Sequence, residues 1–226
     1  MVGSSWMSLG KPTYEGWNMK SICLIAKGPS AVHADKFISE SDDVAVVNDA
    51  GIFTDRDVDY CFCTHNYNIT LKSTIHKIKN LVTPRKNLLP ENTKDGRGGM
   101  HLLNKVNNVN KIIYEECGCA GDLGNLTRRI IKGGICHTYT STGALHWLAK
   151  HGKYDVIKVI GVDGGIEYAP GAYFHQPTID FLNQKCYERT GIKNHIHDLS
   201  KEVFMRLAGI LENVYDCRIS FYNEES

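Results

Sequence analysis

The stretch TGALHWLAKHGKYDVIKVIGVD, residues 142–163, decides the fold that we predict from the sequence. Its first half predicts a helix over 142–152 that Gly152 closes, because glycine readily adopts the left-handed conformation at a helix end. VIKVIGVD (156–163) is an apolar run with β-branched residues, so it predicts a strand with Asp163 at its carboxyl end. A helix that leads directly into a buried strand is typical of an α/β protein.

Three further apolar runs precede this unit. SICLIA (21–26) predicts a strand that ends in the turn-forming KGPS, and ADKFIS (34–39) then has helical spacing. DVAVVND (43–49) and DYCFCTH (59–65) predict two more strands. Continuous apolar runs of this kind suit a parallel sheet that is buried on both faces.

The remaining segments extend the alternation of strands and helices. NITLKSTIHKIKNL (68–81) has apolar residues in helical spacing, NKIIYEEC (110–117) predicts a strand, and NLTRRIIK (125–132) predicts a short helix. RISFY (218–222) alternates as an edge strand does. The helix before it has an apolar stripe formed by Val203, Leu207, Ile210, Leu211 and Val214.

These elements predict one α/β domain over 21–226, after a polar N-terminal extension over 1–20. Alternating strands and helices favour a single doubly wound, mostly parallel sheet of the Rossmann-like type. The chain has 226 residues, of which 42% are hydrophobic. A domain of this size can bury one core without disulfides or metals.

The charge balance gives the chain no global attraction for anions. Lys and Arg number 26 against 25 Asp and Glu, a formal charge of +1, so we expect no nucleic-acid partner and only local binding of anions. The opening residues lack the apolar core of a signal peptide, and no run reaches the roughly 18 apolar residues of a membrane span. We therefore expect a cytoplasmic protein without an integral membrane span.

The cysteines are scattered through the expected strands and helices, a pattern typical of reduced thiols in a cytosolic interior. Structural zinc sites usually place two ligands two to four residues apart, and the sequence has no C-x-x-C, so we expect no metal site. The eight cysteines are Cys23, Cys61, Cys63, Cys117, Cys119, Cys136, Cys186 and Cys217.

Ligands of open parallel sheets bind beyond the carboxyl ends of the strands, so the loops there hold the candidate residues. After the first strand, Gly28 and Pro29 allow a close approach of the backbone, Ser30 can cap the next helix, and its neighbouring N–H groups can face an anion. Lys27 adds a cation that could contact a phosphate. A plain turn with a helix cap explains the same residues.

The loops after the second and third strands carry further polar groups. Asn48 and Asp49 end one strand, and His65 and Asn66 end the next, which brings amide, carboxylate and imidazole groups to one rim. Each of these residues is also a common turn former.

Ser141, Thr142 and Gly143 begin the helix that precedes the strand over 156–163. A hydroxyl group and free backbone N–H groups at a helix start can bind a phosphate or a carboxylate. Simple helix capping explains the same three residues.

His197 lies just ahead of the last amphipathic helix in this interpretation, with Asp198 or Ser200 as the cap. A helix N-terminus disfavours the charged imidazolium, so His197 would stay neutral and could accept a proton. The alternative is a histidine that only packs and hydrogen-bonds at the helix start.

The ordered set of GPS, a strand ending in Asn48, TSTG before a helix, GVD after a strand, and HDLSKE resembles the CMP-sialic-acid sialyltransferases. SICLIAKGPS is similar to the amino end of the bacterial enzymes, with a loop one residue shorter. TSTGALHWLAKHGKYDVIKVIGVD is similar to sialylmotif S of the animal enzymes, with Thr140 in place of proline, and HDLSKE is similar to their very short motif. The resemblance extends over most of 21–222 and implies a GT-A-like variant of the fold.

The resemblance implies a transfer of sialic acid or a related acidic sugar from a CMP-activated donor to a glycan hydroxyl. His197 would be the general base, and neither a metal nor another cofactor would be needed. Tyr168 or Tyr173 would assist the leaving phosphate. The CMP part of the donor would be held by Gly28, Pro29, Ser30, Asn48, Ser141, Thr142 and Gly143. We add Lys27, Asn66 and Asp163 as donor-binding candidates because they lie in the loops at the same rim.

Two features depart from the family pattern. The bacterial enzymes use two tyrosines six positions apart, and Gly165 stands where the first is expected. The animal enzymes join two motifs by a disulfide, for which the sequence offers no convincing counterpart.

Three alternatives stay open. A pterin diphosphokinase-like enzyme with a GPSL-type loop would use ATP and a magnesium site, to which Asp49 and Asp163 could contribute. A nucleotide-binding module without catalysis would agree with the missing tyrosine. An NAD-binding Rossmann domain is disfavoured because KGPS is not G-x-G-x-x-G.

Overall fold

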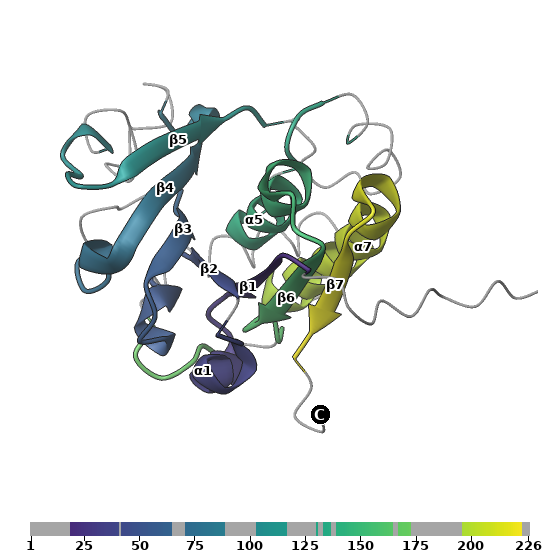
Figure 1. The fold of residues 1–226 in the computed structure, drawn as a ribbon, viewed down its shortest axis with the longest axis horizontal. Coiled ribbons are helices and arrows are strands. Elements are labelled where there is room, and N and C mark those ends of the chain that lie inside the picture. Colours follow the sequence, from purple (N-terminus) through teal and green to yellow (C-terminus); the bar gives the residue numbers. More distant parts are fainter. Residues whose placement is uncertain are drawn as a thin grey trace, which may run out of the picture.

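The computed structural model describes residues 19–40, 42–64, 71–88, 103–116, 130, 133–136, 139–164, 167–172 and 196–222. Seven strands form one sheet in the order β5-β4-β3-β2-β1-β6-β7, and every neighbouring pair is parallel (Figure 1). The predicted doubly wound fold is confirmed, with a fully parallel sheet among the described strands. Their bounds are β1 Ser21–Ile25, β2 Asp43–Val47, β3 Val58–Phe62, β4 Ile78–Pro84, β5 Asn110–Tyr114, β6 Val156–Ile160 and β7 Arg218–Phe221.

Helices cover both faces of this sheet. On one face lie α5 (Thr140–Trp147), continued by a π-helical turn over Leu148–Gly152, and α7 (Ile196–Tyr215) (Figure 1). The opposite face is covered by short elements, which include η1 (Pro29–His33), α1 (Ala34–Phe37) and η2 (Ala50–Phe53). Two further 3₁₀ turns are η3 (Ile75–Lys77) and η4 (Arg85–Leu88).

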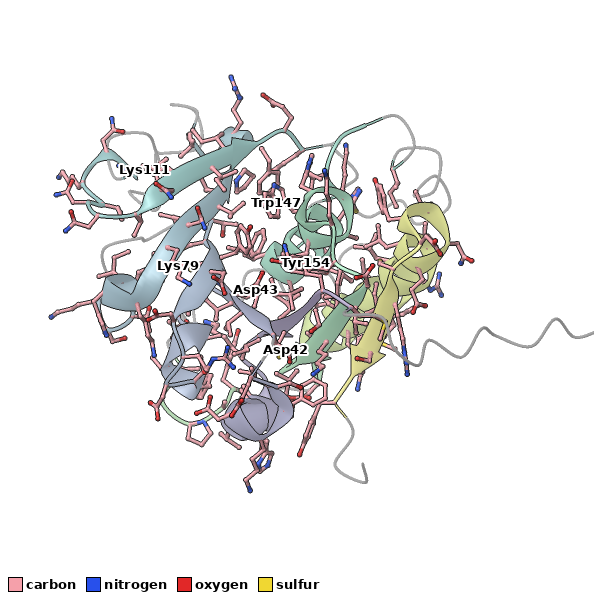
Figure 2. All side chains as sticks on the ribbon, in the orientation of Figure 1. Asp42, Asp43, Lys79, Lys111, Trp147 and Tyr154 are labelled. Atoms are coloured by element: carbon pink, nitrogen blue, oxygen red, sulfur yellow. The ribbon has the colours of Figure 1, made fainter. Side chains whose placement is uncertain are left out.

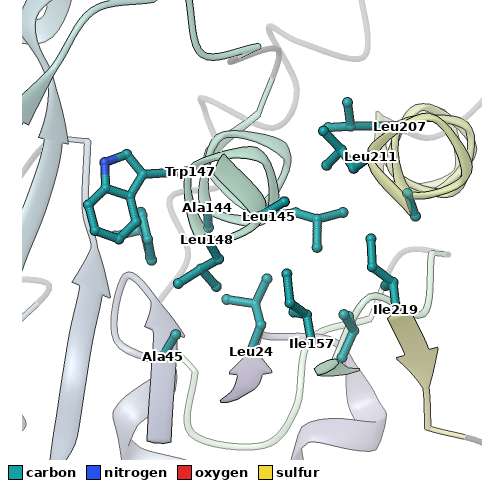
Figure 3. Packing of buried hydrophobic residues seen from close by; sticks show 14 of the residues in the cluster. Leu24, Ala45, Ala144, Leu145, Trp147, Leu148, Ile157, Leu207, Leu211 and Ile219 are labelled. Atoms are coloured by element: carbon teal, nitrogen blue, oxygen red, sulfur yellow. The ribbon is translucent and has the colours of Figure 1, made fainter. Parts of the chain in front are cut away.

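Alternate residues of the central strands divide between two apolar cores. In β1, Leu24 packs into the core beneath α5 and α7, whereas Cys23 and Ile25 belong to the core on the opposite face. Because both faces are buried, the central strands are apolar almost throughout, as the sequence predicts. Figure 3 shows the first core, where strand residues meet helix residues such as Leu145 and Leu211.

The connections create a switch point in the middle of the sheet. The chain moves outwards from β1 to β5, then returns so that β6 pairs with the free side of β1. The strand order therefore reverses between β1 and β6. In open α/β sheets the ligand crevice lies outside the carboxyl ends of the strands at this point.

The helix expected over 68–81 is wrong. Residues 71–74 form turns, η3 follows, and β4 then pairs with β3 in the register Val58↔Ile78. Ile75, Ile78 and Leu81 have helical spacing, but a strand buried on both faces needs no alternation, so the same letters fit a strand. Pairing on both edges, with β3 and β5, selects the strand.

The predicted helix over 142–152 differs at both ends. It begins at Thr140, and its last residues form a π-helical turn. The left-handed residue that ends it is Lys153, with φ of 52°, not Gly152. The strand that follows is confirmed but ends at Ile160, so Asp163 lies in the loop after it, and the edge strand β7 is confirmed.

The last helix begins earlier than its amphipathic pattern suggested. Because α7 starts at Ile196, His197 lies within its first turn, and Asp198 and Ser200 lie inside the helix instead of capping it. Leu207 and Leu211 are fully buried, whereas Val214 is 36% exposed at the C-terminal end of the stripe.

A polar network is centred on Asp42, which directly precedes β2 and is labelled in Figure 2. Asp42 is fully buried as a side chain and accepts hydrogen bonds from the Ser21 hydroxyl, the Ser39 N–H at 2.7 Å and the Lys158 ammonium at 2.7 Å. Burial alone would raise the pKa of Asp42, but the bonds from Lys158, Ser21 and Ser39 together lower it. This network lies at the opposite edge of the sheet from the loops that follow β1 and β6.

The described cysteines are packed in the interior, as the sequence predicts. All five are buried, and burial raises the pKa of Cys23 to about 12 and that of Cys217 to about 11. Cys117, Cys119 and Cys186 lie outside the described residues. No helix in the described ranges is long and apolar enough to cross a membrane.

Candidate functional site

Ser30 and Asp163 join the loops that follow β1 and β6. The Ser30 hydroxyl donates to Oδ1 of Asp163 at 2.7 Å, and the Ser30 N–H donates to Oδ2 at 2.8 Å. The Gly161 N–H in turn donates to the Ser30 Oγ at 3.0 Å. We call this arrangement the Ser30–Asp163 latch. The helix cap expected at Ser30 is wrong, because its side chain bonds across to the other loop.

Gly28 allows the latch to form. Its N–H donates to the Gly161 carbonyl at 2.8 Å, and an added Cβ would lie 2.4 Å from Oδ2 of Asp163. Real Cβ atoms do not approach an oxygen so closely, so a side chain here would displace the Asp163 carboxylate. Gly28 thus permits a close approach as expected, and its partner in the structure is the loop after β6.

Lys27, Asp49 and Tyr168 form a second group, which we call the Lys27 cluster. The Lys27 Nζ lies 3.1 Å from Oδ1 of Asp49, and their side chains are only 14% and 4% exposed. The same ammonium lies 5.1 Å from the centre of the Tyr168 ring, within range of a cation–π contact. Burial, and then the Asp49 carboxylate, raise the pKa of Tyr168 to about 12. Its phenol therefore stays protonated at neutral pH and can donate a hydrogen bond.

Asn48 turns the chain out of β2 toward this cluster. It adopts the left-handed conformation with φ of 56°, which asparagine tolerates better than most residues. Its N–H donates to the Phe62 carbonyl at 2.9 Å, and its own carbonyl accepts the Cys61 thiol at 3.3 Å. Asn48 is therefore a turn former, which is one of the two roles that the sequence left open for it.

The start of α5 lies at the same edge of the sheet. The Thr140 Oγ1 is 3.3 Å from the Oγ1 of Thr64, which follows β3. The buried Thr142 hydroxyl donates to the Tyr139 carbonyl at 2.8 Å and accepts the Tyr139 N–H at 2.9 Å, so it stabilises the helix start. First-turn N–H groups have no acceptor within their own helix, and they carry the positive end of its dipole. Ser141 and these N–H groups are what α5 offers to an anion.

The start of α7 is tied to the loop after β6. The Lys201 ammonium donates to the Asp163 carbonyl at 2.9 Å. His197 precedes Lys201 by about one helical turn along the backbone of α7. The backbone of His197 is thus positioned near the carboxyl edge of the sheet.

The structure brings most of the predicted donor residues to one edge, around the latch and the Lys27 cluster. Asn66, Tyr173 and Gly165 lie outside the described residues, and the described side chains do not include that of His197. Sequence reasoning missed Lys201 and Thr64. The four-residue spacing between His197 and Lys201 could have indicated that Lys201 lies near the candidate site, whereas no sequence pattern pointed to Thr64.

The carboxylates considered for a magnesium site have other partners. Both oxygens of Asp163 accept hydrogen bonds from Ser30, and Asp49 pairs with Lys27. In the ranges that the structure describes, no three His, Cys, Asp or Glu side chains are grouped so that they could hold a metal ion.

Fold and site together define a doubly wound α/β protein whose candidate crevice lies at the switch point between β1 and β6. No protein-family model matches the chain, and no curated protein matches it. It is similar to the solved structure of the monofunctional alpha-2,3-sialyltransferase Cst-I from Campylobacter jejuni, with 17% identity and a TM-score of 0.48, over 92% of this chain and 78% of that one. It is also similar to a variant of the sialyltransferase Cst-II in complex with CMP, with 13% identity and a TM-score of 0.45, over 88% of this chain and 80% of that one. At these values the likeness transfers neither a residue role nor an activity.

Proposed function

We propose that the protein is a glycosyltransferase that moves sialic acid or a related acidic sugar from a CMP-activated donor to a glycan hydroxyl. One observation carries the proposal. The segments that resemble the sialyltransferase motifs, KGPS, TSTG, GVD and HDLSKE, come from distant parts of the sequence. Contacts between Ser30 and Asp163, Thr140 and Thr64, and Lys201 and Asp163 bring them to the carboxyl edge of the sheet.

The CMP part of the donor would lie along this edge. Adjacent strands are roughly 4.8 Å apart, so the loop after β1 and the start of α5 beside β3 are separated by about 10 Å. A nucleotide can bridge such a span. The loop over Lys27–Ser30 would face one end of it, and Ser141 with the first N–H groups of α5 would face the other, with Asn48 between them.

The chemistry is a direct displacement. His197 takes the proton of the acceptor hydroxyl, and the acceptor oxygen attacks the anomeric carbon as its bond to the phosphate oxygen breaks. The departing electron pair remains on the phosphate of CMP. The protonated Tyr168 phenol and fixed N–H groups stabilise that charge without reorganising, so no metal is required for this step. Tyr173 would offer a second hydroxyl.

A ligand screen tests the nucleotide first. A ligand at 100 times its Kd adds about 2.7 kcal/mol to the free energy of unfolding, so CMP should raise the Tm in a screen of CMP, CDP, UDP, ATP and NAD. A shift with ATP or NAD and none with CMP would overturn the proposal.

Turnover of CMP-sialic acid in EDTA tests the reaction. We expect activity in the natural chain, loss of it in His197→Ala, and retention of it in His76→Ala, a control at an exposed histidine before β4. Binding of CMP without turnover would indicate a binding module. Dependence on ATP and magnesium would indicate a diphosphokinase-like enzyme.

A further inference from the structure

Lys27 is a largely buried cation at the switch point. Lysines are almost never fully buried unless they are paired, because a buried ammonium loses its hydration. Here 14% of the side chain is exposed, and its partner Asp49 is buried more completely, with 4% exposed. Since β1 and β2 are neighbours, the loops that carry this pair are adjacent at the carboxyl edge.

Several contacts fix the position of the ammonium. Asp49 sits between the left-handed Asn48 and the 3₁₀ turn η2, so its backbone is anchored on both sides. The Lys27 carbonyl accepts the Ala169 N–H at 2.9 Å, and the Tyr168 ring lies over the ammonium. A cation held in this way needs little rearrangement to interact with a charge that develops beside it.

We propose that Asp49 is a positioning residue that holds the Lys27 ammonium against the phosphate of the CMP donor. This inference rests on the proposed function and extends it to a residue that the sequence did not include among those that hold the donor. Lys27 contacts the phosphate, and Asp49 acts through Lys27. When the bond between the anomeric carbon and the phosphate oxygen breaks, its electron pair stays on the phosphate and faces Lys27. No proton leaves Lys27 in this step.

Asp49 also limits how tightly free CMP is held. Its carboxylate repels the phosphate and partly neutralises Lys27, so the bound product is attracted less than it would be by a lone ammonium. The fixed geometry favours the charge that develops during bond cleavage. Removal of the Asp49 charge is therefore expected to lower kcat while it tightens the binding of CMP, whereas damage to the fold would lower kcat and weaken that binding.

Asp49→Asn tests this expectation, because it removes the charge and keeps the shape. We expect kcat for sugar transfer to fall about tenfold because the ammonium is no longer fixed, and the Kd of CMP in calorimetry to fall about threefold because a repulsive charge is gone. Asp59→Asn is the matched control, since Asp59 pairs with Lys79 at 2.9 Å at the opposite edge, and it should leave both values unchanged. An unchanged kcat in Asp49→Asn, or a weaker binding of CMP, would overturn the inference.

A double-mutant cycle separates positioning from simple support of the fold. Lys27→Met should lower kcat strongly, and adding Asp49→Asn to it should lower kcat no further, because Asp49 supports kcat through the ammonium. The double variant replaces a buried pair by neutral groups, so it keeps the test available if a single variant does not fold. Additive losses would contradict the inference.

Measurements on the natural chain distinguish failure of the proposed function from failure of the role inferred for Asp49. If that chain neither binds CMP nor turns over the donor, the proposed function fails and this inference fails with it. If it does both while Asp49→Asn has normal kinetics, only the inference fails.

Discussion

His146 makes the folded chain sensitive to mild acid. Its side chain is fully buried, Nδ1 accepts the Cys136 N–H at 2.7 Å, and Nε2 lies 3.2 Å from the Tyr215 hydroxyl. Because Nδ1 accepts, the neutral ring carries its proton on Nε2 and donates it to Tyr215. Protonation of Nδ1 would break the bond to Cys136 and bury a charge. Burial, followed by repulsion from Lys150 and His151, lowers the pKa of His146 to about 4.

The size of the effect follows from linkage. A group with a lowered pKa in the fold binds its proton more readily in the unfolded chain, where the pKa of histidine is about 6.5. The stabilisation is complete above pH 6.5 and is lost as the pH falls toward 4. Each pH unit in this window costs about 1.4 kcal/mol, so the total loss is about 3 kcal/mol. This is a large part of the roughly 5–15 kcal/mol that stabilises a typical domain.

Urea unfolding at several pH values between 7.5 and 4, followed by tryptophan fluorescence, measures this loss. His146→Asn is the comparison, because its side-chain carbonyl can still accept the Cys136 N–H but does not titrate. Contributions from other groups, including His151 and the carboxylates, cancel in the difference between the two proteins. We expect that difference to change by about 3 kcal/mol across the window. Equal pH dependence in both proteins would refute this explanation.

Three further predictions concern stability. Gly28→Ala should lower the free energy of unfolding by about 1–3 kcal/mol, because the added Cβ would meet Oδ2 of Asp163. Gly209→Ala should raise it by about 0.5–1 kcal/mol, because Gly209 has open space around it in α7. Thermal melts of the two variants check both values. Asp42→Asn should cost about 3 kcal/mol at pH 7 by leaving Lys158 without its charged partner. Since the pKa of Asp42 is lowered in the fold, this cost should stay constant down to about pH 4 and decline only as the pH falls further, and a cost independent of pH would argue against it. Lys153→Gly should stabilise by about 1 kcal/mol by relieving a left-handed residue, and a lower Tm would show that the lysine makes a compensating contact.

The sheet was predictable because its strands are buried on both faces. SICLIA, DVAVV and VIKVI are apolar runs too short for helices, and parallel packing needs no other pattern. The same lack of alternation concealed β4, whose residues fit a helix equally well until pairing with β3 and β5 is known. Pairing with strands that are distant in the sequence decides whether such a segment forms a helix or a strand. A local stretch of sequence carries no information on that pairing.

The site was predictable in its location and not in its contacts. Loops after strands of a parallel sheet meet at one edge, so the grouping of Lys27, Ser30 and Asp163 follows from topology alone. That Ser30 bonds to Asp163, and that Asp49 pairs with Lys27, depends on side-chain directions that spacing does not determine. The start of α7 also shifted, because amphipathic spacing marks the buried turns of a helix better than its exposed first turn.

The Ser30–Asp163 latch also indicates that the candidate site forms late during folding. Ser30 and Asp163 are separated by 133 positions. The loop after β1 can contact the loop after β6 only once β6 has paired with β1. Contacts of such long sequence separation form slowly, because a large loop must close before they stabilise anything. A growing chain that ends before β6 can pair β1 with β2 but has no partner for Ser30. Nucleotide binding would therefore begin only when β6 has completed the sheet beside β1. An amino-terminal fragment that ends before β6 would not bind the nucleotide.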